Sequence, residues 1–585
     1  MMKRRRPTEA APAPTAEVIT PLGSSLVASR RIGAILLEQG ALSEDTLVHA
    51  TALQAIEGGR LGAMLIRSGA ITSGDLIEAL SVQFDMPVFD LRRDRAMPDA
   101  LRMIDESVAR LLTVVPLSTD GTTLRVAVSD PLDDRLAGHF SQLPVARVEV
   151  VLADPDHIRS TLNDSYKALA SVGEQIRQFE ASVPPVAPLA DTRTSIDEAD
   201  APIVSVVDGI VAQALRDRAS DVHIEPTDGH VRVRYRIDGA LTEVLTLPAS
   251  MANPLVSRIK IMASMNIVER RRPQDGQFQA VIDGRELDVR VATTSTIFGE
   301  KAVLRLLDKS RSLLPLAQLG MPEATYEIYS KIVHQPYGMV ICSGPTGSGK
   351  TTTLYATLAE ISHDEVNVMT IEDPVEYIFP KINQTQINAQ ADVTFAVGLR
   401  SILRQDPDII LVGEIRDAET ARIAVQSALT GHVVMSSLHA TDSASALYRL
   451  LDMGIEPFLV SSAVVGVVAQ RLVRRICPSC REEYSPSEAE LAWYAHVWGP
   501  PKAKFLHGTG CNYCSGTGYR DRIGVYEVLQ ITDEIRHLLT TGAAPGEVRK
   551  KAVAQGMSSL GNAAAMLVHS DQTTIDEAIR NVYVP

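Results

Sequence analysis

Three kinds of hydrophobic pattern follow one another along the chain. Residues 31–54 carry short amphipathic helical segments, and the same pattern returns at residues 60–83. Val231–Gly239 alternates apolar and charged residues, which predicts a strand with one buried face. Further on, Met339–Cys342 and Ile409–Val412 are continuous apolar runs, which we expect to be buried strands of a parallel sheet. The patterns together predict an α/β protein with several domains.

The first apolar run leads directly into a glycine-rich loop and then into a predicted helix. Glycines allow the backbone to wrap a polyphosphate, a lysine places positive charge near the β and γ phosphates, and a threonine hydroxyl can bind Mg²⁺. The order of strand, loop and helix is the one that a P-loop requires. We therefore predict a nucleotide site formed by Gly344, Pro345, Thr346, Gly347, Ser348, Gly349, Lys350, Thr351 and Thr352.

Two later strands end in carboxylates. The apolar stretch from Val366 leads to Glu372, Asp373 and Glu376, and the run Ile409–Val412 leads to Glu414. A strand end beside a P-loop is where a group that activates water or binds Mg²⁺ would lie. The alternative for each acid alone is a capping or ion-paired role.

Two histidines, His432 and His439, flank the strand predicted at residues 433–437, which follows a helix at 417–429. Each could pack structurally or could sense the bound nucleotide, and the sequence leaves both interpretations open.

Composition limits the class of protein. A chain of 585 residues is too long for one core and predicts about three to five domains. A formal net charge of −14 disfavours non-specific binding of nucleic acid. Residues 1–27 begin with basic residues but lack an apolar core, so we expect a disordered tail rather than an export signal. The apolar stretch 458–469 is too short to span a membrane, so any membrane association would come through a partner protein.

The N-terminal pattern is an internal repeat. A block of 24 residues that starts at Arg31 returns at Arg60, after the spacer 55–59, and each copy predicts a helix, a glycine stop, a Ser or Thr cap and a second helix. Alternating short strands and helices from 86 to 167 complete an N-terminal α/β domain, at 28–168. Residues 169–199 are rich in Ala, Pro, Ser and Thr and predict a linker.

The second domain, residues 200–310, is unusually rich in arginine. A solvated sheet face would explain many of these side chains. A second interpretation is that several of them reach the triphosphate, because guanidinium groups stabilise the charge of phosphoryl transfer.

Four of the five cysteines form two Cys-x-x-Cys pairs, Cys477 with Cys480 and Cys511 with Cys514. Four thiolates at this spacing suit a structural, tetrahedral Zn²⁺ site, whereas disulfides are disfavoured where no export signal is evident. Cys342 lies in the strand before the P-loop and is expected in the core.

The motifs of the region from about residue 200 onward resemble the secretion ATPase superfamily. They are the P-loop, Glu-Asp-Pro-Val-Glu-Tyr at 372–377, Leu-Arg-Ser-Ile-Leu-Arg at 399–404, Val-Gly-Glu-Ile-Arg-Asp at 412–417 and Ala-Gln-Arg-Leu-Val-Arg at 469–474. The resemblance is strongest to the extension ATPases of type II secretion and type IV pilus assembly, whose branch also has the four cysteines. It implies a PAS-like domain at 200–310 and a RecA-like ATPase domain at 311–585, with the zinc knuckle at about 476–520.

The resemblance also implies roles. Lys350 and Thr351 belong to the Walker A site, Glu376 activates water, Glu414 lies near Mg²⁺, and His432 and His439 form the His box. The family's arginines correspond to Arg258, Arg272 and Arg290 in the preceding domain and to Arg400 and Arg404 between the motifs. The implied protein is a cytoplasmic homohexamer that acts on an inner-membrane platform protein and is recruited by a cytoplasmic partner.

The tandem N-terminal blocks resemble a cyclic-di-GMP-binding domain found on some of these ATPases, with Arg31, Gly33, Arg60 and Gly62 as candidate ligand residues. Alternatively, the repeat only builds a helical bundle. Two other function classes compete with an ATP-driven motor. One is a cyclic-di-GMP-responsive scaffold with little turnover, which the intact Glu376 and Glu414 oppose. The other is a DNA-translocating or GTP-hydrolysing protein, which the acidic charge and the lack of an Asn-Lys-x-Asp motif oppose.

Overall fold

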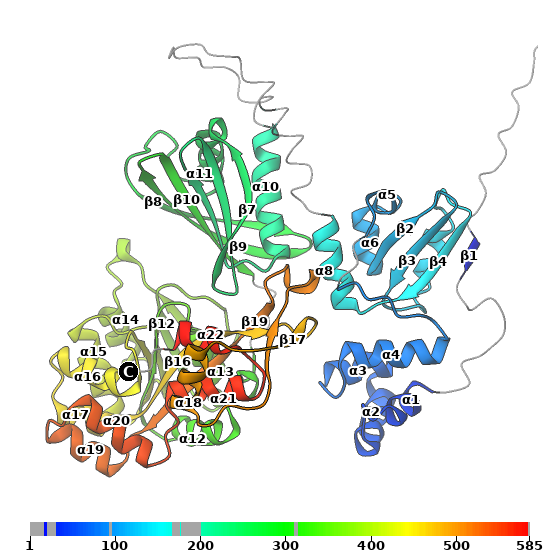
Figure 1. The fold of residues 1–585 in the computed structure, drawn as a ribbon. Coiled ribbons are helices and arrows are strands. Elements are labelled where there is room, and N and C mark those ends of the chain that lie inside the picture. The colour runs from blue at the N-terminus through cyan, green and yellow to red at the C-terminus, as the bar shows by residue number, and fades with distance from the viewer. Residues whose placement is uncertain are drawn as a thin grey trace, which may run out of the picture. The chain divides into compact units, whose positions relative to one another are not determined.

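The computed structural model describes residues 17–19, 31–92, 96–166, 176, 179, 201–308 and 314–582. Contacts divide the chain into two compact units. Unit 1 comprises residues 1–217 with 509–518, and unit 2 comprises 218–508 with 519–585. The mixed α/β class predicted from the sequence is confirmed (Figure 1). The domain boundaries that we placed at 168, 199 and 310 stay predictions.

The tandem repeat of unit 1 folds as two helix pairs. The first copy gives α1 (Ile32–Glu38) and α2 (Glu44–Glu57), and the second gives α3 (Leu61–Arg67) and α4 (Ser73–Phe84). Ser43 and Thr72 cap the second helix of each pair through their side chains, as their sequence positions predicted. A Cβ added to Gly33 would come within 2.8 Å of Leu47, and one added to Gly62 within 2.6 Å of Leu76. Each glycine therefore allows the two helices of its copy to pack closely.

A four-stranded sheet forms the rest of the N-terminal fold. It contains β2 (Val114–Thr119), β3 (Thr123–Val128) and β4 (Arg147–Leu152), with helices α5 (Pro98–Leu101), α6 (Glu106–Leu112), α7 (Arg135–Phe140) and α8 (Pro155–Ser165). The strand β1 (Glu17–Ile19) pairs parallel with β4. The prediction of a disordered tail over 1–27 is therefore wrong at these three residues, whose backbone hydrogen-bonds to the sheet edge.

The predicted tail and linker fall largely outside the part of unit 1 that the structure describes. The rest of the predicted tail lies outside the described residues, as does the predicted linker 169–199 except for residues 176 and 179, which are helical. Helix α10 (Ala201–Arg216) follows. The short helix η4 (Asn512–Cys514) also belongs to this unit, in which Ser160 donates a 2.7 Å hydrogen bond to the Asn512 carbonyl.

Unit 2 begins with a six-stranded antiparallel sheet of order β7-β6-β5-β10-β9-β8. Its strands are β5 (Asp221–Pro226), β6 (His230–Ile237), β7 (Ala240–Pro248), β8 (Gln274–Ile282), β9 (Arg285–Thr296) and β10 (Gly299–Asp308), and α11 (Ala252–Met262) connects β7 to β8. The alternation predicted for β6 is observed. Val231, Val233 and Tyr235 are fully buried, whereas the arginines between them lie on the other face.

The second sheet of unit 2 has seven strands in the order β13-β12-β14-β15-β11-β16-β19. These are β11 (Gly338–Ser343), β12 (Val368–Glu372), β13 (Asn383–Gln386), β14 (Ile409–Val412), β15 (Val433–Leu438), β16 (Val464–Ile476) and β19 (Tyr519–Gln530). All neighbouring pairs are parallel except β16 with β19. One strand, β15, separates the P-loop strand β11 from β14, and this arrangement is the RecA-like fold.

Helices cover both faces of this sheet (Figure 1). Met339 and Ile341 of β11 belong to one buried cluster, whereas Val340 and Cys342 belong to another, so the strand is buried on both sides. The covering helices are α12 (Glu323–Val333), α13 (Lys350–Ile361), α14 (Phe395–Ile402), α15 (Ala418–Leu429), α16 (Ser443–Asp452), α17 (Pro457–Ala463), α19 (Asp533–Thr540), α20 (Pro545–Ala554), α21 (Leu560–His569) and α22 (Ile575–Asn581).

A small hairpin accompanies this domain. Its strands are β17 (Arg481–Tyr484) and β18 (Phe505–Gly508), and α18 (Glu488–Val497) connects them. The apolar stretch 458–469 is divided between α17 and β16. Within the described residues, no helix has both the length and the apolarity that a membrane span requires.

Candidate functional site

The P-loop lies between β11 and α13 and depends on its glycines. Gly344, Gly347 and Gly349 have φ angles of +153°, +78° and +87°, which favour glycine. A Cβ on Gly344 would lie 2.5 Å from the carbonyl oxygen of Gln470, and one on Gly349 would lie 2.8 Å from its side-chain nitrogen. The loop therefore packs directly on β16, and the first turn of α13 directs unpaired amides toward its mouth.

Lys350 begins α13 and points back over the loop. Its Nζ donates hydrogen bonds to the carbonyl oxygens of Gly344, at 2.8 Å, and Pro345, at 3.0 Å. Burial lowers the pKa of Lys350, because the charged form is partly removed from water. An anionic phosphate bound in the loop would compensate this loss of solvation. Cys342 is fully buried, as predicted.

A pocket of about 1130 Å³ opens above the P-loop, and all of its lining belongs to unit 2. The carboxyl ends of the parallel strands meet at this edge of the sheet, so residues that follow β12, β14 and β15 reach the same space. Among the predicted residues, the lining includes all of Pro345–Thr352, together with Glu376, Glu414 and His439.

Glu414 follows β14, and its carboxylate lies between the side chains of Arg416 and His439. Its carboxylate pairs with the guanidinium of Arg416, and its Oε2 lies 3.5 Å from Nε2 of His439. The hydrogen bond that Arg416 donates to Glu414 raises the pKa of Arg416. Thr351 also lines the pocket, so a hydroxyl and a carboxylate face the phosphate position, and such oxygen donors are the ligands that Mg²⁺ prefers.

Glu376 lies on the loop after β12. One of its oxygens is 3.3 Å from Nη1 of Arg290, on β9, and the other is buried with no hydrogen-bond partner among the described residues. Arg290 thus links the six-stranded sheet to the loop that follows β12, and the idea that arginines of this sheet reach the triphosphate stays a prediction. An acid with one unpartnered oxygen in a pocket is chemically suited to accept a proton.

Several other predicted residues lie away from this pocket. His432 precedes β15, and its Nδ1 lies 2.9 Å from the Ser427 carbonyl oxygen. It therefore occupies the opposite end of the strand from His439 and does not line the pocket, and its place in the His box stays a prediction. Arg400 pairs with Glu419, and Arg404 donates to the Arg400 carbonyl.

The three predicted arginines of the six-stranded sheet domain are also absent from the lining, although Arg290 pairs with the lining residue Glu376. Arg258 lies on α11, and Arg272 lies in the loop before β8. A single chain therefore does not place them at its own P-loop. The lining contains seven arginines that the sequence did not single out as site residues: Arg236, Arg305, Arg416, Arg471, Arg474, Arg522 and Arg580. Arg236 and Arg305 both pair with Asp221, the first residue of β5, and the alternation of β6 is the signal that could have identified Arg236.

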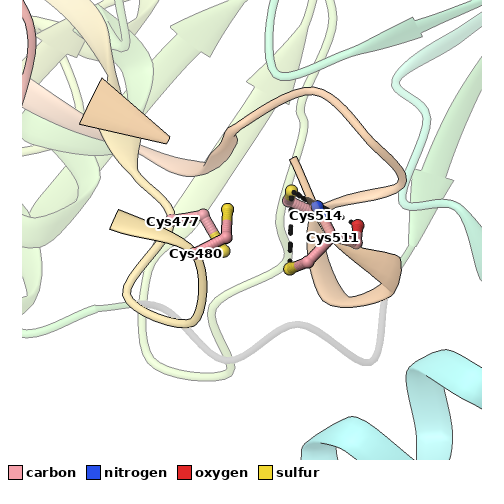
Figure 2. A group of neighbouring side chains, drawn as sticks. All are labelled: Cys477, Cys480, Cys511 and Cys514. Atoms are coloured by element: carbon pink, nitrogen blue, oxygen red, sulfur yellow. Dashed lines mark hydrogen bonds between the residues drawn. The ribbon is translucent and has the colours of Figure 1, made fainter. Parts of the chain in front are cut away.

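The four cysteines of the predicted knuckle come together (Figure 2). Their sulfur atoms all lie within 4.8 Å of one another, and none of the five cysteines, all of which are described, forms a disulfide. The Sγ atoms of Cys511 and Cys514 are 3.8 Å apart, which matches the edge of a tetrahedron with zinc–sulfur bonds of about 2.3 Å. Backbone N–H groups of Cys511 and Gly518 donate to Cys514 Sγ, each at 3.2 Å. The donor set therefore fits Zn²⁺.

The N-terminal candidates occupy equivalent places in the two copies of the repeat. Arg31 and Arg60 each precede the first helix of their copy. Arg60 pairs with Asp130 and donates to the Leu132 carbonyl oxygen at 3.2 Å, and Arg31 is exposed. Gly33 and Gly62 are buried in helix contacts.

Comparison with known proteins gives two family matches. The model of the family described as "Type II/IV secretion system protein" matches residues 197–580, and the MshEN domain model matches residues 84–172. The second match begins after the tandem repeat and so does not include Arg31 or Arg60.

Relatives cover most of the chain. It is 39% identical over 564 residues to the type IV pilus assembly ATPase PilB of Myxococcus xanthus, covering 94% of this chain and 99% of that one. It is 45% identical over 428 residues to the type II secretion system protein HxcR of Pseudomonas aeruginosa, covering 72% and 86%. The structure of the ATPase DotB of Legionella pneumophila is 21% identical, with a TM-score of 0.49, and covers 67% of this chain and 97% of that one.

Proposed function

The chain belongs to the Type II/IV secretion system protein family, and from this premise we propose that it is an ATP-hydrolysing motor that drives assembly of a pilus or pseudopilus. The observation that carries the proposal is the pocket lined by the P-loop, Glu376 and Glu414, with Arg290 paired to Glu376. A phosphate cradle beside carboxylates and an arginine suits phosphoryl transfer to water.

The chain's own residues supply each part of this reaction. P-loop amides and Lys350 hold the triphosphate, while Thr351 and Glu414 would hold Mg²⁺, which neutralises charge on the β and γ phosphates when it is bound. Glu376 accepts a proton from the attacking water, and the guanidinium of Arg290 stabilises charge that develops on the γ-phosphate. The proposed subunit acts in a homohexamer, where Arg258 and Arg272 could serve a neighbouring site.

Further parts of the proposal concern other ligands and partners. The cysteine cluster holds a structural Zn²⁺, and the tandem repeat binds cyclic-di-GMP through Arg31, Gly33, Arg60 and Gly62. The motor works in the cytoplasm at the inner membrane, through a platform protein and a cytoplasmic recruiting protein. The similarity to a pilus assembly ATPase and to a type II secretion protein supports this setting.

The proposal is tested by ATP hydrolysis with purified full-length protein. We expect magnesium-dependent turnover in the wild type and a loss of at least 100-fold in both Lys350→Ala and Glu376→Gln, because the first removes a phosphate contact and the second removes the base. Lys381→Ala is the matched control, since this lysine is exposed and pairs with Asp364 on the surface. Wild-type protein without turnover, or full activity in Glu376→Gln, would contradict the proposal.

A further inference from the structure

Tyr355 connects the P-loop helix to the loop that carries Glu376. It lies on α13, one and a half turns after Lys350, and its side chain is buried. Its ring meets those of Tyr377 and Phe379 edge to face, with centroid distances of 6.1 and 5.2 Å. These contacts hold the residues that follow Glu376 against α13.

The hydroxyl group of Tyr355 takes part in two hydrogen bonds, as the donor in one and the acceptor in the other. It donates a hydrogen bond to Oε2 of Glu372, the last residue of β12, and it accepts one from the backbone N–H of Glu376 at 3.2 Å. Burial raises the pKa of Tyr355, so the hydroxyl keeps its proton and remains a donor.

Glu372 is itself buried and held from several directions. Its Oε1 accepts hydrogen bonds from Thr370 at 2.6 Å and from Gln384 at 3.2 Å. Gln384 also donates to the carbonyl oxygen of Tyr377 at 2.9 Å. A buried carboxylate with this many donors is a fixed anchor rather than a mobile acid.

We propose that Tyr355, anchored by Glu372, is a positioning residue for the hydrolytic reaction. Its hydroxyl fixes the main chain at Glu376 with respect to the helix that holds the phosphates. The inference rests on the proposed role of Glu376 as the base, and adds to it the group that sets the distance between base and phosphate. Neither Tyr355 nor Glu372 needs to touch the substrate for this role.

The test is Tyr355→Phe in the full-length protein, which keeps the ring contacts and removes only the hydroxyl. We expect kcat for ATP to fall at least tenfold, because a small displacement of a catalytic group has a large effect on rate. Affinity for a non-hydrolysable ATP analogue is expected to change less than twofold, because the P-loop and Lys350 are intact. This split between turnover and binding is not expected from a loss of stability alone.

Tyr329→Phe is the matched control. Tyr329 lies on α12, and its buried hydroxyl hydrogen-bonds at 2.8 Å to Thr357 of α13. Among the described residues it has no hydrogen bond to the acids of the site. The two variants each lose one buried phenol, but Tyr329→Phe is expected to keep kcat within about twofold of the wild type. Equal kcat values in the two variants would overturn the inference.

Glu372→Gln provides a second test of the positioning role, which can be carried out even if the Tyr355→Phe variant does not fold. It should lower kcat in the same way, and the double variant should be no slower than the slower single variant, since both changes remove one connection. A Glu372→Gln protein with wild-type kcat overturns the inference. An active wild type with an active Tyr355→Phe refutes the positioning role alone, whereas an inactive wild type refutes the proposed function and the positioning role together.

Discussion

Glu225 shows at the scale of single residues how charge is arranged on the six-stranded sheet. Its carboxylate is 6% exposed and is surrounded by Arg232, Arg234 and Lys301, at distances of 3.1, 2.9 and 2.8 Å. Burial alone would raise its pKa, but hydrogen bonds from Arg234 and Lys301 outweigh this and lower the pKa of Glu225 to about 2. The surrounding cations therefore hold the Glu225 carboxylate in its charged form.

Because the folded-state pKa of Glu225 lies below the unfolded value, its contribution to stability is present in full above pH 4.5 and is lost as the pH falls toward 2. Glu225→Gln should therefore lower the free energy of unfolding at pH 7 by about 3 kcal/mol, because three cations lose their partner. The difference from the wild type should shrink steadily between pH 4.5 and 2 in denaturant titrations. A difference that stays constant with pH would contradict this assignment.

Residue positions were predictable where one motif fixes them in a short span of chain. The glycines of the P-loop and the acids that follow β12 and β14 were found because a strand end and a loop place them at one edge of the sheet. The place of His432 was not predictable, because the two histidines that flank a strand of six residues lie at its opposite ends, about 23 Å apart at 3.3 Å per residue. The sequence identified Tyr355 only as a residue that follows the P-loop. Its role could not be predicted, because its hydrogen-bond partners Glu372 and Glu376 lie 17 and 21 residues further along the chain.

Individual elements were predicted best where their burial is uniform. The runs that form β11 and β14 are buried at every position, so apolar continuity was sufficient to find them. The pairing order of the strands was not accessible from these runs. It depends on side-chain packing between segments that are far apart in the sequence.

The cysteine knuckle is an element whose stability should depend on a metal. Four thiolates at contact distance repel one another unless a cation neutralises them, so removal of Zn²⁺ should loosen the segments around Cys477–Cys480 and Cys511–Cys514. We expect one equivalent of zinc per chain by elemental analysis, and a fall of several degrees in Tm after chelation. Cys480→Ser should lose the metal, whereas Cys342→Ser, in a core strand, should retain it. Metal-free protein of unchanged Tm would contradict a structural site.

At the scale of the whole molecule, the sequence predicted the succession of N-terminal, arginine-rich and ATPase regions from changes of pattern along the chain. Contacts divide the chain differently, because residues 509–518 are grouped with the N-terminal part although they follow β18 in sequence. A long-range grouping of this kind leaves no local signal. It arises from hydrogen bonds such as that between the Asn512 side chain and the Leu91 carbonyl, at 3.2 Å.

Each copy of the tandem repeat contributes one arginine at an equivalent position. Cyclic-di-GMP has two-fold symmetry and two phosphates, so one phosphate is available to pair with each arginine. Calorimetry with the full-length protein should show binding in the micromolar range, and Arg31→Ala and Arg60→Ala should each weaken it at least tenfold. Arg31→Ala is the cleaner variant, since Arg60 also pairs with Asp130 and its loss disturbs unit 1. Arg67→Ala, at the last turn of α3, should bind as the wild type does. No heat from the wild type at micromolar ligand would mean that the repeat only builds a bundle, because the glycines at 33 and 62 already have a packing role against Leu47 and Leu76.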